Sequence, residues 1–563
     1  MKNINKERNQ KMKKSLTLTL IFFVFSTILN AQITEQWAKR YNGPGNGTDK
    51  AYSMALDLSG NAYVTGSSIS GGFGTEDIAT IKYNSAGTQV WLSRFNGTGS
   101  GTDIGYAVAV DASGNVYVTG TSWGTGTSYD YVTIKYNSSG DSVWVRRYNG
   151  SKNANDKAFA IFVDGTGNVY VTGASEGTVG VHGIFEDYVT VKYGPSGTQL
   201  WAASYNGPGG DYDGAASIAV DGSGNVYVTG ESGGGSSGSG STYQDYATIK
   251  YNSAGITQWV SRYNGYSTGH DFAAMLKIDA SGNVFVTGKS SGSGTGYDFA
   301  TIKYNTAGTQ MWVSRYTSAG SSSDEGTSLA IDAAGNVYVT GISYGGTTNG
   351  NDFATIKYSS TGVQTWVQTY NGPASSNDGG RSIFVDASSN IFVTGYSTGS
   401  GTAFDYATLK YSSSGTQEWV IRYTNSNSSG SSDEAVCVKS DGSGNVWVTG
   451  MSALDYATVK YTPSVTGVNS TGETKPVEYS LSQNYPNPFN PATTIKYHIL
   501  DNTHVSLTVY DINGKEVANL VNQDQVKGIY EINFDAGKLS SGVYFYKLVT
   551  NEFSDVKRMT LVK

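Results

Sequence analysis

The sequence predicts an all-β chain, with an eight-bladed β-propeller of four-stranded antiparallel blades followed by a small β-sandwich. Three observations lead to this prediction. One sequence unit recurs eight times at intervals of 53 to 58 residues, each unit contains four short runs of strand character, and one further run precedes the first unit. A unit this short cannot bury its own apolar surface, so neighbouring units must cover one another.

Three anchors set the register of the units. A turn of pattern D-x-x-(G/S)-N begins at Asp57, Asp111, Asp164, Asp221, Asp279, Asp332, Asp386 and Asp441. A segment of pattern D-(Y/F/I)-(A/V)-T-(I/V/L)-K-Y begins at Asp77, Asp130, Asp187, Asp245, Asp298, Asp352, Asp405 and Asp455. A tryptophan recurs at Trp37, Trp91, Trp144, Trp201, Trp259, Trp312, Trp366 and Trp419.

The second unit illustrates the four strands that we expect in each blade. They are Tyr106–Val110, Val116–Thr119, Tyr131–Tyr136 and Val143–Tyr148. Valine, isoleucine, tyrosine, threonine and tryptophan dominate these runs and suit a pleated, packed surface. Glycine and asparagine in the intervening D-A-S-G-N and N-S-S-G-D segments tolerate the positive φ of tight turns. Repeats of four antiparallel strands are typical of propeller blades.

The order of the pieces predicts how the ring closes. The run around Trp37 precedes the first complete unit, and the last unit has no tryptophan run of its own. We therefore expect the first run to supply the outer strand of the last blade, which would remove two exposed sheet edges. The alternative is an open stack of sheets.

The repeated motifs G-N-V-Y-V-T-G, D-Y-A-T-I-K-Y-N-S-A-G and Q-x-W-V-x-R-Y-N-G carry a family resemblance. From about Gln36 to Tyr461 the chain resembles the bacterial β-propeller repeat that is often called the seven-bladed propeller repeat. The resemblance implies a propeller. Because eight complete sets of motifs are present here, we expect eight blades.

Residues 1–31 are predicted to be a signal peptide. Six basic residues precede an apolar run from Leu16 to Leu29, and cleavage is expected after Ala31. The run is short for a membrane span, and no other apolar stretch is long enough to cross a bilayer. The propeller is then expected over residues 32–461.

Charge and cysteine content limit the functions to be considered. Removal of residues 1–31, with six basic and one acidic side chain, changes the formal net charge from −7 to −12. Such a surface repels phosphate backbones, so we expect no nucleic-acid partner. Cys437 is the one cysteine, so no intrachain disulfide is possible, and we expect it to be a small buried core residue.

The repeat stops after Tyr461. Residues 462–477 are expected to be a linker, and residues 478–563 a β-sandwich with strands at Thr494–Ile499, Val505–Tyr510, Tyr530–Phe534 and Val543–Leu548. The segments N-Y-P-N-P-F-N-P from Asn484, V-Y-D-I-N-G-K from Val509, S-G-V-Y-F-Y from Ser541 and the final K-R-M-T-L-V-K resemble the C-terminal sorting domain of the type IX secretion system. The alternative is a purely structural sandwich.

This second resemblance implies an address and a partner. It implies that the type IX secretion machinery recognises the C-terminal domain and exports the chain, through the periplasm and across the outer membrane of a Gram-negative bacterium. The mature protein would be secreted or held at the outer cell surface.

Strand direction assigns the connections to two faces of the propeller. The links before the first and third strand of each unit share one face. The link between the second and third strands varies in length there, from Met451–Leu454 to Glu231–Gln244. We call this face the variable-loop face, and the opposite face, with its near-invariant turns, the constant-turn face. Variable loops on a constant scaffold usually carry binding specificity. The candidate ligand-binding residues there are aromatic: Phe73, Trp123, Tyr129, Phe185, Tyr243, Tyr344 and Phe404. Alternatively, these rings cover the blade ends.

Two aspartate series are also expected on the variable-loop face. One begins the third strands, as listed above, and the other is Asp49, Asp103, Asp156, Asp213, Asp271, Asp324, Asp378 and Asp433. A ring of carboxylates could bind calcium as a cofactor. Aspartates also cap turns by accepting backbone N–H bonds, and we expect this structural role here. A lysine five residues after each third-strand aspartate could balance its charge.

Signals for catalysis are poor. The four histidines show no metal-ligand spacing, and no catalytic triad or phosphate-binding loop can be assigned. We expect an exported, non-catalytic propeller that binds a glycan, peptide or protein through its variable-loop face. The alternatives are an extracellular glycan lyase or hydrolase with its site at the channel mouth, and a structural surface-layer component.

Overall fold

The structure is a computed structural model that describes residues 33–72, 74–99, 101–180, 183–236, 242–266, 269–319, 322–346, 350–425, 430–441, 443–463, 469–470, 479–525 and 527–563. Within these ranges the chain forms strands and turns and no helix. One compact unit spans Ala31–Val465, and Thr466–Lys563 belong to a second. The predicted signal peptide and most of the predicted linker lie outside the described residues.

The first unit consists of eight four-stranded antiparallel sheets. Blades 1 to 4 are β2 (Asp49–Leu56), β3 (Ala62–Ile69), β4 (Glu76–Tyr83) and β5 (Gln89–Phe95); β6 (Asp103–Val110), β7 (Val116–Gly124), β8 (Ser128–Tyr136) and β9 (Ser142–Tyr148); β10 (Asp156–Val163), β11 (Val169–Gly180), β12 (Gly183–Tyr193) and β13 (Gln199–Tyr205); and β14 (Asp213–Val220), β15 (Val226–Ser236), β16 (Thr242–Tyr251) and β17 (Thr257–Tyr263).

Blades 5 to 8 repeat the pattern. They are β18 (Asp271–Ile278), β19 (Val284–Ser291), β20 (Tyr297–Tyr304) and β21 (Gln310–Tyr316); β22 (Glu325–Ile331), β23 (Val337–Tyr344), β24 (Asn351–Tyr358) and β25 (Gln364–Tyr370); β26 (Asp378–Val385), β27 (Ile391–Thr398), β28 (Phe404–Tyr411) and β29 (Gln417–Tyr423); and β30 (Asp433–Ser440), β31 (Val446–Ser452) and β32 (Asp455–Pro463) with β1 (Ile33–Tyr41). The predicted eight-bladed propeller is confirmed.

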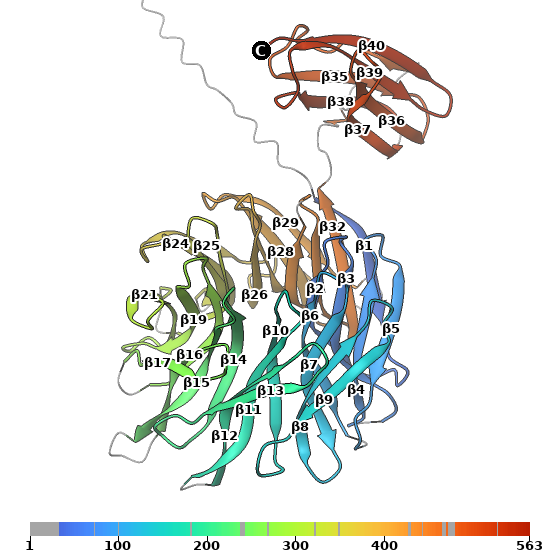
Figure 1. Cartoon of the computed structure of the whole chain (residues 1–563). Coiled ribbons are helices and arrows are strands. Elements are labelled where there is room, and N and C mark those ends of the chain that lie inside the picture. The colour runs from blue at the N-terminus through green and yellow to red at the C-terminus, as the bar shows by residue number, and fades with distance from the viewer. Residues whose placement is uncertain are drawn as a thin grey trace, which may run out of the picture. The chain divides into compact units, whose positions relative to one another are not determined.

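The ring closes as the sequence predicts. Strand β1 pairs antiparallel with β32, from Ile33 opposite Pro463 to Tyr41 opposite Tyr456. In Figure 1 the colour changes gradually from blade to blade except here, where blue β1 lies beside orange β32. Strand β2 of blade 1 packs against β30, β31 and β32, so blades 8 and 1 are neighbours. Cys437 lies at this seam; it is half-buried rather than buried, and its Sγ is 3.7 Å from the Met54 carbonyl oxygen.

A tryptophan on the outer strand attaches each of seven blades to the next. Trp37 Nε1 donates to the Ser85 carbonyl oxygen at 3.2 Å, and its ring lies against Gly87. Gly87 has φ +82°, and a Cβ there would lie 2.7 Å from the ring, so both backbone and packing require glycine. The same donor bond joins Trp91 to Ser138, Trp144 to Pro195, Trp201 to Ser253, Trp259 to Thr306, Trp312 to Ser360 and Trp366 to Ser413.

On the constant-turn face, each D-x-x-(G/S)-N turn is organised by its aspartate. Asp111 Oδ1 accepts from the N–H groups of Ser113 and Asn115, both at 2.9 Å. Its Oδ2 accepts from Asn115 Nδ2 at 2.8 Å and from the Tyr117 hydroxyl at 3.0 Å. Burial raises the pKa of Asp111, but these four hydrogen bonds outweigh it and leave the pKa below its usual value.

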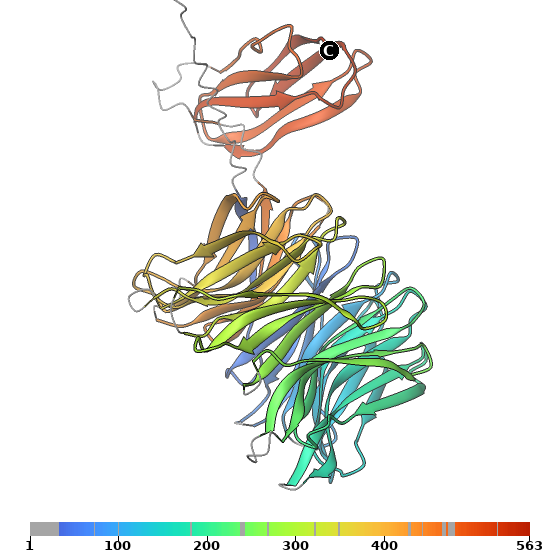
Figure 2. The same cartoon turned by 90° about the vertical axis from the view of Figure 1, so that its left-hand side faces the viewer.

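The second unit is a β-sandwich, as predicted. Its sheets have the orders β33-β38-β35-β34 and β37-β36-β39-β40. They comprise β33 (Asn469–Ser470), β34 (Ser480–Leu481), β35 (Ala492–Ile499), β36 (Thr503–Tyr510), β37 (Glu516–Gln525), β38 (Gly528–Asp535), β39 (Gly542–Val549) and β40 (Ser554–Leu561). The sequence did not predict β37 and β40 as strands, because both are edge strands whose polar side chains interrupt the alternation. Figure 2 shows the strands of both units in a second view.

Candidate ligand-binding face of the propeller

The strands reach further onto the variable-loop face than their apolar residues indicate. In blade 2 the second strand extends to Gly124 instead of Thr119, and the third begins at Ser128 instead of Tyr131. Only Ala453 and Leu454 separate β31 from β32, whereas β15 and β16 extend the long blade 4 connection as a ladder to Ser236 opposite Thr242. Much of the predicted loop sequence is therefore regular strand.

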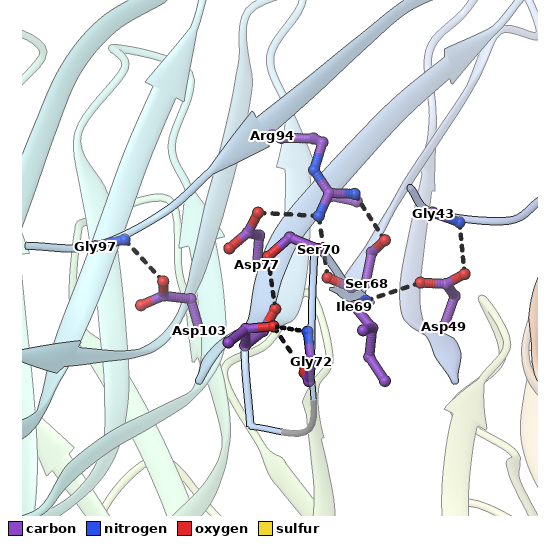
Figure 3. A network of polar contacts seen from close by, with 12 residues as sticks. Gly43, Asp49, Ser68, Ile69, Ser70, Gly72, Asp77, Arg94, Gly97 and Asp103 are labelled. Carbon is purple, nitrogen blue, oxygen red and sulfur yellow. Dashed lines mark hydrogen bonds and ion pairs between the residues drawn. The ribbon is translucent and has the colours of Figure 1, made fainter. Parts of the chain in front are cut away.

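The first-strand aspartates clamp the incoming chain on this face. Asp49 Oδ2 accepts from the Gly43 N–H at 2.6 Å, and Oδ1 accepts from the Ile69 N–H at 3.0 Å (Figure 3). Asp103 holds Gly97 in the same way at 2.7 Å. The equivalent bonds join Asp156 to Gly150, Asp213 to Gly207, Asp271 to Gly265, Asp324 to Ser318, Asp378 to Gly372 and Asp433 to Asn425.

The third-strand aspartates pair with arginines of the outer strand. Arg94 Nη2 lies 2.9 Å from Asp77 Oδ2, and Nη1 donates to Ser68 Oγ at 2.7 Å (Figure 3). Nη1 also donates to the Tyr41 hydroxyl of the preceding blade at 2.6 Å. The same ion pair occurs as Arg40–Asp455, Arg147–Asp130, Arg262–Asp245, Arg315–Asp298 and Arg422–Asp405.

The expected charge balance from the third-strand lysines is therefore wrong. Lys82 Nζ lies 5.1 Å from the centre of the Tyr63 ring, toward the constant-turn face, and the equivalent lysine of every blade covers an aromatic ring in the same way. Because the first-strand aspartates bind N–H groups and six of the eight third-strand aspartates bind a guanidinium, their geometry is that of a scaffold. Among the described residues, no group of three or more histidine, cysteine, aspartate or glutamate side chains is placed to hold a metal ion.

Trp123 and Tyr129 are the predicted site residues that the structure brings together. They are opposite each other in the β7–β8 ladder, and their ring centres lie 4.9 Å apart at 82°. Trp123 lies in strand β7, not in a loop, and 37% of its surface is exposed. The pair combines a partly exposed indole with a second ring that packs against it, and aromatic side chains of this kind can contact the apolar face of a ligand.

Tyr243 belongs to a larger cluster that sequence analysis missed. Its ring lies 5.4 Å from that of His270, which stacks on Phe272 at 5.8 Å, and Phe272 meets Tyr297 at 5.9 Å. Lys289 Nζ lies 5.2 and 5.1 Å from the Phe272 and Tyr297 ring centres and pairs with Glu325 of blade 6 at 3.3 Å; we call these residues the blade 5 cluster.

The other predicted aromatic residues do not join these groups. Phe404 packs on Tyr396 at 4.7 Å, and the Arg381 guanidinium lies 5.1 Å from the Tyr396 ring centre. Phe185 is half-buried in β12, and the N–H of half-buried Tyr344 donates to Asp324 Oδ1. Phe73 lies outside the described residues.

The innermost strands carry a second departure from eightfold symmetry. Each has a register shift beside the third residue after its clamp aspartate, for example at Tyr106 between Gly105 and Ala107. Bulges of this kind re-aim side chains. In blade order the residues are Tyr52, Tyr106, Phe159, Ala216, Ala274, Thr327, Arg381 and Val436. Tyr52, Tyr106 and Phe159 form a continuous arc with ring centres 5.4 Å apart.

Charged side chains break the symmetry at blades 3 and 4. Lys157 Nζ pairs with Glu186 Oε1 at 3.1 Å, and Glu186 also bonds to the Tyr212 hydroxyl. Gly214 leaves room for this tyrosine, because a Cβ there would lie 2.7 Å from its hydroxyl oxygen. Burial raises the pKa of Glu231 to about 7; Lys289 lowers it, and Glu186 raises it further.

The sequence contains a signal for the residues that differ from blade to blade. They lie directly beside invariant positions, for example after the clamp aspartate or after the glycine of V-T-G. A column-by-column comparison of the eight units would have separated these variable columns from the scaffold around them.

Two family models match the chain. The model described as a beta-propeller repeat matches residues 36–74 and 90–126, and the model described as a secretion system C-terminal sorting domain matches residues 483–562. No curated protein matches the sequence. None of the described residues forms a helix that is long and apolar enough to cross a membrane.

Several solved structures are similar at low identity. A fungal alcohol oxidase of the AA5 family in complex with copper has 16% identity and a TM-score of 0.36, covering 81% of this chain and 96% of its own. The α-L-arabinanase of Penicillium chrysogenum, complexed with arabinobiose, has 11% identity and a TM-score of 0.35 over 55% and 93%. The β-propeller domain of the Trilobed protease from Pyrococcus furiosus has 8% identity and a TM-score of 0.35 over 62% and 90%.

Both family resemblances predicted from the sequence are confirmed, in the predicted order. The chain is an exported protein that carries β-propeller repeats followed by a type IX secretion system C-terminal sorting domain.

Proposed function

We propose that this protein is a non-catalytic binding propeller that takes a glycan, peptide or protein on its variable-loop face. The observation that carries the proposal is the distribution of unlike residues among like blades. The clamp aspartates and arginines repeat around the ring, whereas the exposed Trp123, the blade 5 cluster and Arg381 each occur in one place. A ligand that contacts these side chains would meet a different surface at each blade, and such asymmetry favours recognition.

The chemistry of the face favours sugar rings or peptide side chains over apolar ligands. Trp123 offers a partly exposed indole, and Arg381 is an exposed residue whose guanidinium lies over Tyr396. Rings of this kind stack on the apolar faces of sugars, and adjacent charged groups orient hydroxyl or carboxylate groups.

The test is a binding screen of the full chain on glycan and peptide arrays. We expect hits that weaken at least tenfold in Trp123→Ala or Phe272→Ala. The matched control is Leu58→Ala, because Leu58 is fully exposed in a turn of the constant-turn face. Hits that respond equally to all three variants, or no hits, would contradict the proposal and favour a structural surface-layer role.

A glycan-cleaving enzyme is the second candidate, favoured by Glu186 and Glu231. Two neighbouring carboxyl groups are the usual equipment of glycoside hydrolysis, and burial raises the pKa of Glu231 to about 7, which suits a general acid. The array hits should then include a glycan that is shortened on incubation, with product formation lost in Glu231→Gln. Binding without turnover would exclude this candidate for that glycan.

For processing and address, we propose that residues 1–31 are removed as a signal peptide and that 32–461, 462–477 and 478–563 act as propeller, linker and sorting domain. The type IX machinery would carry the chain from the periplasm across the outer membrane of a Gram-negative bacterium. Mass spectrometry of the extracellular and cell-surface fractions would identify both termini of the mature chain. A mature N-terminus well before Ala31 would contradict this assignment.

A further inference from the structure

The inference starts from one set of acceptors on the variable-loop face. In blade 5, the Arg315 guanidinium donates to the Tyr263 hydroxyl at 2.9 Å, to Ser290 Oγ at 2.6 Å, to the Ser290 carbonyl oxygen at 2.9 Å and to Asp298 Oδ2 at 2.9 Å. Tyr263 belongs to the preceding blade, so the arginine joins two blades. Six of the eight blades contain this arginine–aspartate pair.

Blade 6 keeps the acceptors but not the arginine. Thr369 is opposite Ala354 in the ladder, which is the place that Arg315 holds opposite Ala300 in blade 5. Asp352 is opposite Ser343, just as Asp298 is opposite Ser290. Tyr316 supplies the hydroxyl of the preceding blade and bonds to Ser343.

The carboxylate of Asp352 holds the position that it has in the arginine-containing blades. A Cβ on Gly345 would lie 2.5 Å from Asp352 Oδ2, and the equivalent distance in blade 5, from Gly292 to Asp298 Oδ2, is 2.7 Å. The side chain is therefore aimed at the same place without an arginine to hold it there.

This carboxylate is buried and lacks its partner. Asp352 is 8% exposed, and no arginine lies at its Oδ2, the oxygen that holds the guanidinium in the arginine-containing blades. Its Oδ1 has no hydrogen-bond partner among the described residues, which is also true of Asp77, Asp130, Asp245 and Asp405. Burial raises its pKa to about 6, with a further contribution from Asp378 and none from a cation. A buried acceptor of this kind is costly unless a donor reaches it.

In blade 6 an exposed threonine takes the position of the arginine. Thr369 is exposed on the outer strand β25, and the arginines in the other blades are themselves about a quarter exposed. A ligand that binds beside Thr369 would thus occupy the position that the arginine guanidinium occupies in six other blades.

We propose that the outer edge of blade 6 binds a guanidinium group, supplied by an arginine side chain of a partner or by a free guanidino compound, between Tyr316, Ser343 and Asp352. The planar guanidinium can donate to a carboxylate, a hydroxyl and a carbonyl oxygen at once, whereas an ammonium ion is a compact point charge. The inference concerns blade 6 alone. Blade 3 has Ala203 at the same position, but Asp187 there has interactions of its own.

The first test is a calorimetric titration of the full chain with N-acetyl-arginine amide, with N-acetyl-lysine amide as the matched control. We expect saturable binding of the arginine compound with a Kd on the order of 1 to 10 mM and binding of the lysine compound at least tenfold weaker. Absence of saturation below about 100 mM, or equal affinity for the two compounds, would overturn the inference.

The decisive variant is Thr369→Arg, which restores the arginine of the other blades. We expect it to abolish binding and to raise the thermal midpoint, whereas Asp352→Asn weakens binding at least tenfold and Trp123→Ala leaves it unchanged. If Thr369→Arg folds and still binds, or if its midpoint falls, the acceptors do not receive a guanidinium as inferred.

A comparison of arginine peptides with the capped amino acid identifies the source of the guanidinium group. Arginine-containing peptides that bind at least tenfold more tightly than the capped amino acid would identify a partner protein, and equal affinity would identify a free guanidino compound. The result is independent of the proposed glycan or peptide function, because Trp123→Ala separates the two sites.

Discussion

The constant-turn face carries one aspartate series and the variable-loop face carries two, and the surroundings of the turn aspartate Asp111 and of the clamp aspartate Asp156 move their pKa values in opposite directions. Four hydrogen bonds lower the pKa of Asp111, and the same arrangement brings that of Asp164 to about 2. On the other face burial dominates, and the pKa values of the clamp residues Asp156 and Asp213 rise to about 6. The constant-turn face is therefore stabilised by its carboxylates at neutral pH, whereas the variable-loop face is destabilised by some of its own.

This difference shows where each face can tolerate change. The turn aspartates are fully used within their own turns, so any replacement leaves several donors without a partner. The clamp aspartates hold the chain where neighbouring side chains differ from blade to blade. Strict repetition marks the scaffold of the propeller, and breaks in the repetition mark the candidate binding surface.

The largest effect should come from removing a scaffold tryptophan. Trp37→Ala deletes an 8% exposed ring at the closing seam and the bond from Nε1 to Ser85. We expect a loss of about 3–5 kcal/mol in the free energy of unfolding. Urea denaturation followed by circular dichroism measures it, and a loss below about 1 kcal/mol would show that β1 does not close the ring.

The second effect concerns a turn aspartate. Asp111→Ala leaves two N–H groups, the Asn115 amide and the Tyr117 hydroxyl without their acceptor, at a cost of about 2–3 kcal/mol at pH 7. Because the folded pKa lies below the unfolded one, this stability is present above about pH 4 and is lost as the pH falls through the folded pKa. The difference between the wild-type chain and the variant should thus shrink near pH 2.5; a constant difference would refute the electrostatic part of the argument.

The third effect is a pH dependence of stability whose sign is opposite to that of Asp111. The pKa of Asp352 is raised to about 6, so its contribution to stability is present below about pH 4 and is lost as the pH rises through about 6. Asp352→Asn should match the wild-type chain at pH 4 and exceed it by on the order of 1–2 kcal/mol at pH 8, after allowance for solvent near the blade edge. Thermal melts at both pH values measure this, and a variant that is less stable at pH 8 would contradict the burial argument.

The smallest effect is the matched partner of the first. Trp123→Ala removes the same side chain from the variable-loop face, where it is partly exposed and has Tyr129 as its aromatic neighbour. We expect a change below about 1 kcal/mol in the free energy of unfolding. A cost close to that of Trp37→Ala would mean that Trp123 is a scaffold residue.

The fold could be predicted almost completely from the sequence because repetition reports on packing between blades. Trp37, Tyr63 and Gly87 have equivalents in other units, and their spacing alone indicates blades and closure. The strand ends were predicted too short, because Ser122 and Asp130 are polar yet buried in the hydrogen-bond network of the variable-loop face.

The candidate site could be predicted only in part, because contacts across blades are not visible in one unit. Trp123 and Tyr129 were found by their aromatic character, and their contact follows from the ladder register. His270 precedes β18, Lys289 is in β19 and Glu325 is in β22, so only the fold brings them into one cluster. The unpartnered Asp352 was missed because its consequence depends on the identity of residue 369, which is on another strand.

The pairing of β1 with β32 also imposes an order on assembly. These strands are separated by more than 400 residues, so the first blade-forming segment to leave the ribosome must wait for one of the last before it finds its partner. Contacts this distant in sequence form slowly, and until then the backbone of β1 has no neighbour in a sheet. The ring therefore stays open until β32 has been synthesised.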